Sequence, residues 1–158
     1  MPALHDRFTL ERRYPHGRER LYAALSDPAL KQRWHAGAKM AVLDFEMDFR
    51  VGGAERQRYA LGPETPFPGL VLENEGRFED IVEGERIVLT TTMTFGGKRI
   101  STSLLTFELA DTGDDGSSLT FTHQAAFYEG ADGPEMRRAG CESMLDSLAR
   151  SLAQVPTA

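Results

Sequence analysis

Three short glycine-containing links between residues 71 and 126 constrain the fold more than any other feature of the sequence. They are Glu83-Gly84-Glu85, Gly96-Gly97-Lys98 and the acidic turn at 111–116, and they separate stretches rich in β-branched residues. Links this short join antiparallel neighbours as hairpins. An antiparallel meander is therefore predicted, with strands at 71–82, 86–95, 100–109 and 118–126.

Before this meander, short extended and short helical segments alternate. Residues 8–14 alternate apolar and polar side chains, which predicts a first strand that stops at a Pro-His-Gly turn. Residues 18–25 have apolar side chains at helical spacing. A second short helix is predicted from Pro28 to about Trp34, with Asp27 as its N-cap.

The most regular alternation in the chain lies at residues 43–49. Every second residue is apolar and acidic residues stand between them, so one face is predicted to be buried and the other solvated. The next strand is predicted at 55–61, where Arg56 and Arg58 share a face. An outward direction is favoured for this pair over an inward, anion-binding one, because an unpaired buried guanidinium is costly. The proline-rich loop at 62–69 has the composition of a lid.

A long amphipathic helix is predicted to begin at Pro134. Apolar or small residues recur every four positions, with Leu145 alongside them, and this stripe is expected to face the sheet: Met136, Gly140, Met144, Leu148 and Leu152. A sheet of six or seven antiparallel strands needs a cover for its apolar face, and no other predicted helix is long enough. The predicted fold is therefore α+β, in one domain spanning residues 5–154, with two short helices after the first strand.

The charge balance narrows the classes of partner. With 18 Lys and Arg residues against 24 Asp and Glu, the formal net charge is −6, so no attraction to nucleic acid is expected. The single cysteine, Cys141, cannot form an internal disulfide, and the first residues lack the pattern of a signal peptide. No apolar stretch approaches the roughly 18 residues that cross a bilayer. A cytoplasmic protein without membrane insertion is expected, and a homodimer is left open.

Motifs that identify an enzyme or a metal site are missing from the sequence. Gly-x-Ser-x-Gly, His-Glu-x-x-His and Cys-x-x-Cys do not occur, and the turn at 111–116 lacks the spacing of a calcium loop. No histidine partner for Cys141 is identifiable, so a cysteine nucleophile is not favoured. We therefore expect no metal and no cofactor, and a binding protein is preferred to an enzyme.

The order of several short motifs resembles one known family. The motifs are Ala24-Leu25-Ser26-Asp27-Pro28 with Arg33-Trp34, Asp48-Phe49-Arg50-Val51-Gly52-Gly53, Phe78 with Glu85-Arg86-Ile87-Val88, Thr106-Phe107-Glu108-Leu109, Leu119-Thr120-Phe121-Thr122-His123, and Gly140 followed by Leu145, Leu148 and Leu152. From about residue 8 to residue 152, the chain is similar to the family named after the activator of Hsp90 ATPase, within the START-like and Bet v 1-like SRPBCC superfamily. The resemblance implies a helix-grip fold, a curved sheet around the last helix, and a lipid-like or aromatic ligand.

Two positions depart from this family's pattern. Where relatives usually have a large aromatic residue after the helix glycine, this chain has Cys141. Where they often have an aromatic residue after the tryptophan of the second helix, it has His35. Both departures imply an interior that is roomier or more polar than in a typical relative.

Three aromatic side chains are candidates for ligand contacts, each with a structural alternative. Trp34 either walls a cavity or seals the end of the core. His35 either points into a pocket or is solvated at a helix end, which is the commoner case. His123 shares a strand face with Leu119 and Phe121, so it is expected to point inward, either as a polar anchor or as a hydrogen-bonded core histidine.

The favoured function is non-catalytic binding of a small hydrophobic molecule in a cavity between the sheet and the last helix. The residues expected to line this cavity are Trp34, Phe45, Met47, Phe49, Tyr59, Met93, Phe121, His123, Met136, Gly140, Cys141 and Met144. One alternative is a cyclase-, aromatase- or hydrolase-like enzyme that uses His123 and an arginine. Another is a chaperone-associated interaction domain, which the family's name implies.

Overall fold

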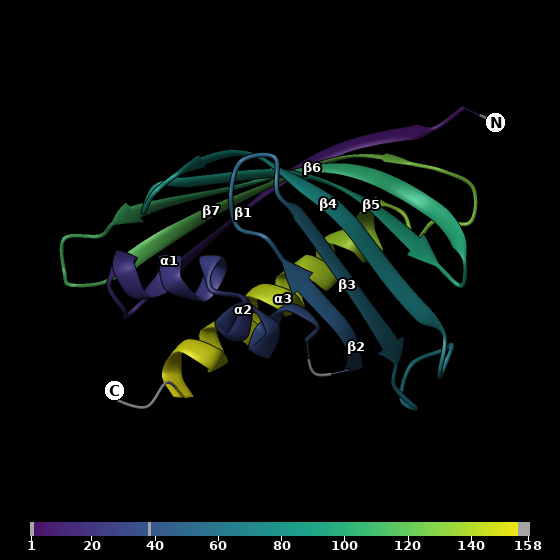
Figure 1. Ribbon diagram of the computed structural model, residues 1–158, viewed down its shortest axis with the longest axis horizontal. Helices are drawn as coiled ribbons and strands as arrows, with labels where there is room; N and C mark the ends of the chain where they lie inside the picture. Colours follow the sequence, from purple (N-terminus) through teal and green to yellow (C-terminus); the bar gives the residue numbers. More distant parts are fainter. Residues whose placement is uncertain (1, 38, 155–158) are drawn as a thin grey trace.

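The computed structural model describes residues 2–37 and 39–154. Within these residues, strands and helices follow in the predicted order (Figure 1). The strands are β1 (Leu4–Tyr14), β2 (Met40–Met47), β3 (Ala54–Leu61), β4 (Val71–Val82), β5 (Arg86–Phe95), β6 (Lys98–Asp111) and β7 (Ser117–Phe127). The helices are α1 (Arg18–Ser26), α2 (Pro28–His35) and α3 (Pro134–Gln154).

All the described strands belong to one antiparallel sheet with the order β1-β7-β6-β5-β4-β3-β2. Strands β2 to β6 each pair with the next strand along the chain, and β1 pairs with β7 over its whole length. The sheet is strongly curved and arches over α3 (Figure 1). The predicted α+β fold with its antiparallel meander is confirmed.

The first half of β2 departs from the predicted alternation. Its register against β3 shifts between Val42 and Asp44, which leaves Leu43 as an extra residue in a bulge. Leu43 is 51% exposed, whereas Phe45 and Met47 are partly buried. The expectation of one buried face for all apolar residues of 43–49 is therefore wrong at Leu43, which is unpaired in the bulge and exposed.

The two short helices pack together through the end of α2. The side chain of Asp27 caps α2 by accepting hydrogen bonds from the backbone N–H groups of Ala29 and Leu30, as predicted. Trp34 Nε1 donates to the backbone carbonyl of Ala24 in α1 at 3.0 Å. This bond satisfies the only polar atom of the indole and allows its complete burial.

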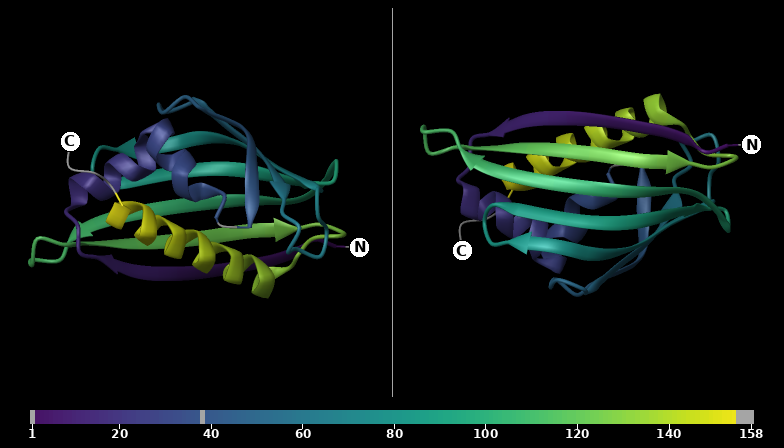
Figure 2. Two further views of the ribbon diagram at one scale, coloured as in Figure 1. Left: turned by 90° about the horizontal axis from the view of Figure 1, so that it is seen from below. Right: turned by 90° about the horizontal axis from the view of Figure 1, so that it is seen from above.

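Helix α3 crosses the concave face of the sheet diagonally, and α1 and α2 lie on that same face (Figure 2). Leu145, Leu148 and Leu152 are fully buried in a core that also includes Trp34 and apolar side chains of β1 and β4 to β7. The core therefore lies beneath the C-terminal half of α3. No helix among the described residues has the length and apolar character needed to span a bilayer.

The N-terminal half of α3 presents a different stripe from the predicted one. Arg137 and Cys141 are buried, whereas Met136 is 66% exposed and Gly140 is also exposed. The expectation that Met136 and Gly140 line an interior cavity is therefore wrong. Residues four positions apart in a helix differ in direction by about 40° around the helix axis, because four residues exceed one turn. The side chains at 144, 140 and 136 therefore point progressively further from the direction of Leu148.

Candidate functional site

Two rows of mainly small or polar side chains cross the concave face of the sheet, and we call them the polar rows. Directly paired residues of antiparallel strands point to the same side, so the registers of β3 to β7 define each row. One row consists of Glu55, Gly76, Thr91, Ser103 and Ala125. The other consists of Gln57, Asn74, Met93, Ser101 and Phe127.

The middle of the polar rows is not tightly covered. Asn74, Thr91 and Met93 on the concave face are partly exposed. Apart from Met93, the side chains in the middle of these rows are short.

A buried ion pair joins α2 to one end of the polar rows. Lys31 Nζ lies 2.7 Å from Glu55 Oε2, and both side chains are 4% exposed. Gln57 Nε2 donates to the other carboxylate oxygen, Oε1, at 2.5 Å. Burial acts to raise the pKa of Glu55, but the charge of Lys31 and the hydrogen bonds from Lys31 and Gln57 outweigh it and lower that pKa. The carboxylate is therefore held in its charged form.

The second contact between α2 and β3 is made by His35 and Tyr59. His35 Nδ1 lies 2.5 Å from the Tyr59 hydroxyl, and the imidazole also lies against the rings of Trp34 and Phe45. Burial, together with the charge of Lys31, lowers the pKa of His35 to about 4. Burial also raises the pKa of Tyr59, so the hydroxyl keeps its proton and donates to a neutral imidazole. The expectation of a solvated His35 is wrong.

A third polar cluster connects α3 to the opposite end of the polar rows. Arg137 donates to both carboxylate oxygens of Asp132 at 2.8 Å and to Ser101 Oγ at 2.9 Å. His123 Nε2 lies 3.5 Å from Arg137 Nη1 and 3.5 Å from Ser103 Oγ. The imidazole of His123 stacks on Phe8, with ring centroids 4.7 Å apart.

His123 is neutral and has one unused nitrogen. Burial, with the nearby charge of Arg137, lowers the pKa of His123 to about 4. A guanidinium only donates, so Nε2 is the acceptor and the ring proton is on Nδ1. The backbone of His123 acts to raise the pKa of its ring, but this effect is outweighed by burial. Nδ1 is buried and has no hydrogen-bond partner in the described part of the chain. The side-chain oxygen of Asn74 is buried and unpartnered in the same way.

The residues predicted to bind ligand fall into three groups. Buried in the interior are Trp34, Tyr59, Phe121, His123 and Cys141. Partly buried are Phe45, Met47, Phe49, Met93 and Met144. Met136 and Gly140 lie on the exposed side of α3, away from the others. Burial raises the pKa of the Cys141 thiol to about 12, so this cysteine is not a thiolate near neutral pH.

Several polar residues of the interior were not predicted: Lys31, Glu55, Gln57, Asn74, Ser101, Ser103 and Arg137. One signal was present in β3, where Arg56 and Arg58 point outward, as favoured, and pair with Glu75 and Glu73. Strict alternation then requires Glu55 and Gln57 to point inward with Tyr59. The buried cations Lys31 and Arg137 had no comparable signal, because charged helix residues are normally solvated.

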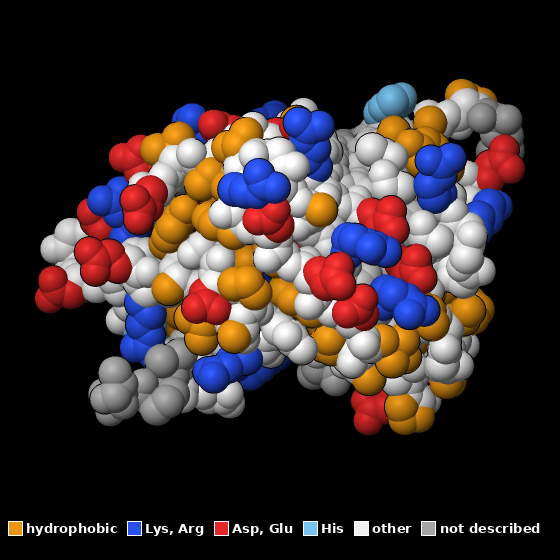
Figure 3. All heavy atoms as spheres, viewed as in Figure 1, with side chains coloured by type: hydrophobic (Ala, Val, Ile, Leu, Met, Phe, Trp, Pro, Cys, Tyr) orange, Lys and Arg blue, Asp and Glu red, His pale blue; other side chains and the backbone are white. Residues whose placement is uncertain are grey.

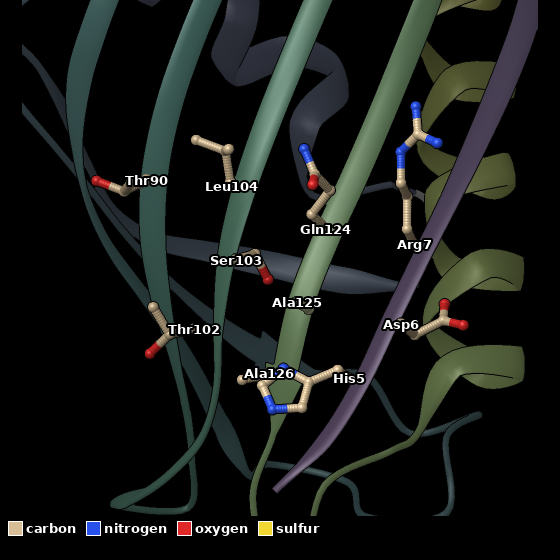
Figure 4. Close-up of a pocket in the computed structure, with 10 residues that line it drawn as sticks. All are labelled: His5, Asp6, Arg7, Thr90, Thr102, Ser103, Leu104, Gln124, Ala125 and Ala126. Atoms are coloured by element: carbon tan, nitrogen blue, oxygen red, sulfur yellow. The ribbon is translucent and has the colours of Figure 1, made fainter.

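The outer, convex face of the sheet has a different character. An open hollow of about 600 Å³ lies over β1, β7, β6 and β5, and His5, Arg7, Leu104 and Gln124 are among the residues that line it (Figure 4). Elsewhere on the surface, acidic and basic side chains are interspersed (Figure 3), and pairs such as Arg86 with Asp80 connect neighbouring strands. Within the described residues, no group of His, Cys, Asp and Glu side chains is arranged to hold a metal ion.

Comparisons with known proteins agree on one family. Residues 15–153 match the family described as Activator of Hsp90 ATPase homolog 1-like protein. Among solved structures, an uncharacterized protein from Rhizobium leguminosarum is 31% identical, with a TM-score of 0.87 and coverage of 97% of each chain. A protein from Rhizobium loti is 37% identical, with a TM-score of 0.83 and coverage of 96% of this chain and 99% of that one.

A more distant structure shows the same fold. The AHSA1 protein from Silicibacter pomeroyi is 21% identical, with a TM-score of 0.74 and coverage of 94% of this chain and 98% of that one. No curated protein matches the chain. The sheet, the two short helices after β1 and the gripped C-terminal helix form the helix-grip, Bet v 1-like arrangement. The chain belongs to the Activator of Hsp90 ATPase homolog 1-like family.

Proposed function

We propose that this protein binds a small, largely apolar molecule between the concave face of the sheet and α3, without catalysing a reaction. The observation that supports this proposal is the combination of short side chains and partial exposure in the middle of the polar rows. Met93, with Phe45 and Met47 at the β2 end of the same rows, offers partly exposed apolar surface for such a ligand. Members of this fold group commonly hold hydrophobic ligands, which agrees with the geometry.

An enzyme of the cyclase or hydrolase kind is the second candidate, because titratable side chains do meet on the concave face. Their protonation states favour binding. A raised pKa keeps Tyr59 protonated, and pKa values of about 4 make His35 and His123 weak bases near neutral pH. The Lys31 ammonium and the Glu55 carboxylate neutralise each other in a direct contact. We therefore assign these groups to shaping and polarising a binding site.

Filling the space from the sheet should abolish binding. Thr91→Phe places a large ring on the concave face, and it should weaken binding of the neutral fluorescent probe N-phenyl-1-naphthylamine by more than about tenfold, or about 1.4 kcal/mol. Phenylalanine suits a strand, so the melting temperature should change little. Probe fluorescence and thermal unfolding are measured on the same samples.

The adjacent outer-face residue provides a matched control. Thr92 points away from α3, and its hydroxyl lies 3.4 Å from that of Thr102 on the neighbouring strand. Thr92→Phe should therefore leave probe affinity at the level of the unmodified protein. Equal weakening by the two substitutions, or by neither, would show that the probe does not occupy the concave side.

A further inference from the structure

The buried charges on the concave face cancel one another. Among the described residues, the charged side chains that are buried are Lys31, Glu55 and Arg137. Lys31 is in direct contact with Glu55, and Arg137 makes a bidentate ion pair with Asp132, whose side chain is 21% exposed. Both cations are therefore already matched by a carboxylate before any ligand binds, and neither offers a free charge to a ligand anion.

The two described histidines beside the polar rows add no positive charge. His35 and His123 are neutral near pH 7, because burial lowers the pKa of each to about 4. Asp6 on the edge strand β1 is paired with Ala125 in the sheet register, which places it on the concave side as well. Its carboxylate adds a negative charge near the end of one polar row. An anionic ligand would enter this space without a counter-charge, which is energetically costly.

Of the three buried side-chain atoms that lack a hydrogen-bond partner in the described residues, Arg20 Nε belongs to α1, and the other two belong to the concave face of the sheet. These two indicate what the ligand offers instead. The N–H at Nδ1 of His123 lacks an acceptor, and the side-chain oxygen of Asn74 lacks a donor, within the described residues. Buried polar atoms are normally hydrogen-bonded, so each of these two favours a polar group on the ligand. A hydroxyl group both donates and accepts, and it satisfies either atom without bringing a charge.

Building on the function proposed above, we propose that the site selects an uncharged apolar ligand that carries a hydroxyl group and rejects the corresponding carboxylate. The selection arises because Glu55 and Asp132 occupy both buried cations. Within the described residues, the polar rows then present hydrogen-bonding atoms and apolar surface, and the two buried cations beside them are already paired.

A matched pair of probes tests this selectivity in the unmodified protein. 1-Decanol and decanoate have the same chain length and differ only in the end group, and each is titrated against bound N-phenyl-1-naphthylamine at slightly alkaline pH, where decanoate is ionised. Decanol should displace the probe at a concentration at least about tenfold lower than decanoate. Equal or tighter binding of decanoate would overturn the proposed selectivity and leave the binding function intact. Failure of the probe and both compounds to bind would overturn both proposals.

Removing the counter-charge of Arg137 should reverse part of the preference. Asp132→Asn leaves the guanidinium unmatched, so decanoate affinity should rise by about tenfold while decanol affinity stays within about twofold. The matched control is Asp146→Asn, since Asp146 lies on the exposed side of α3 and pairs with Arg12. If decanoate binding is the same in both variants and in the unmodified protein, Arg137 does not face the ligand and the inference is wrong.

The unused nitrogen of His123 has its own test. His123→Phe keeps an aromatic ring stacked on Phe8 but removes the N–H donor. This substitution should weaken decanol binding by about three- to tenfold while N-phenyl-1-naphthylamine, which does not need this donor, binds as before. Unchanged decanol binding would exclude His123 as the anchor.

Discussion

Replacing Lys31 with methionine should destabilise the protein by about 3 to 5 kcal/mol, because it leaves the carboxylate of Glu55 buried without its counter-charge. Methionine has nearly the same length as lysine, so the loss of packing is small. Denaturant unfolding of the two proteins measures the difference in free energy of unfolding. A loss below about 1 kcal/mol would contradict the account, since it would mean that water already solvates the pair.

A second substitution separates charge from packing. The double variant Lys31→Met with Glu55→Met removes both charges, and it should recover most of the stability that the single variant loses. Arg58→Ala is the surface control, because Arg58 pairs with Glu73 on the exposed outer face. Its effect should stay below about 1 kcal/mol.

Mild acid should destabilise the protein through its two interior histidines. The pKa of His35 and that of His123 fall from an ordinary value of 6.5 to about 4 in the folded state. Between these values the unfolded chain binds more protons than the folded chain, so stability rises with pH and is lost as pH falls through this window. Each histidine accounts for at most about 3 kcal/mol.

Substitution of the histidines identifies the source of this pH dependence. In His123→Phe, the free energy of unfolding should depend less steeply on pH between about 4 and 6.5, because one proton-binding group of the unfolded chain is gone. His5→Gln, at an exposed position in β1, should retain the slope of the unmodified protein. Identical slopes in all three proteins would contradict the assignment of His123 as a buried neutral group. Below this range, protonation of Glu55, whose folded-state pKa is lowered, should cause further loss.

Local sequence signals were sufficient to predict the architecture. Asp27 before Pro28 predicted the start of α2, and the hydrogen bonds from Ala29 and Leu30 confirm the cap. The glycine-containing links predicted the order of pairing from β4 to β7. Both signals depend on residues that are close in sequence, and this is why they were readable without knowledge of the tertiary structure.

The orientation of α3 required more than a repeated spacing. A strict four-residue spacing from Leu148 selects Met144, Gly140 and Met136, and these residues turn progressively away from the sheet. The observed stripe steps by four, four, three and four through Arg137, Cys141, Leu145, Leu148 and Leu152, which keeps these residues on one side. A buried Arg137 was not predicted, since a charged side chain is rarely buried, although its partner Asp132 is only five residues away.

The polar centre of the candidate site depends on contacts between distant segments. Lys31 and Glu55 come together only when α2 packs on β3, and His123 meets Arg137 only when α3 lies on β7. The local sequence indicates neither contact, because Lys, Glu, His and Arg side chains usually lie at the solvated surface. The inward direction of His123 was predicted correctly from the alternation of β7.

The central claim is that an apolar ligand occupies the space between the polar rows and α3. A crystal structure of the protein with 1-decanol bound tests it most directly. We expect density for the decyl chain beside Thr91 and Met93, with the hydroxyl group of decanol near His123 or Asn74. Density only in the outer hollow beside Leu104 and Gln124 would contradict it.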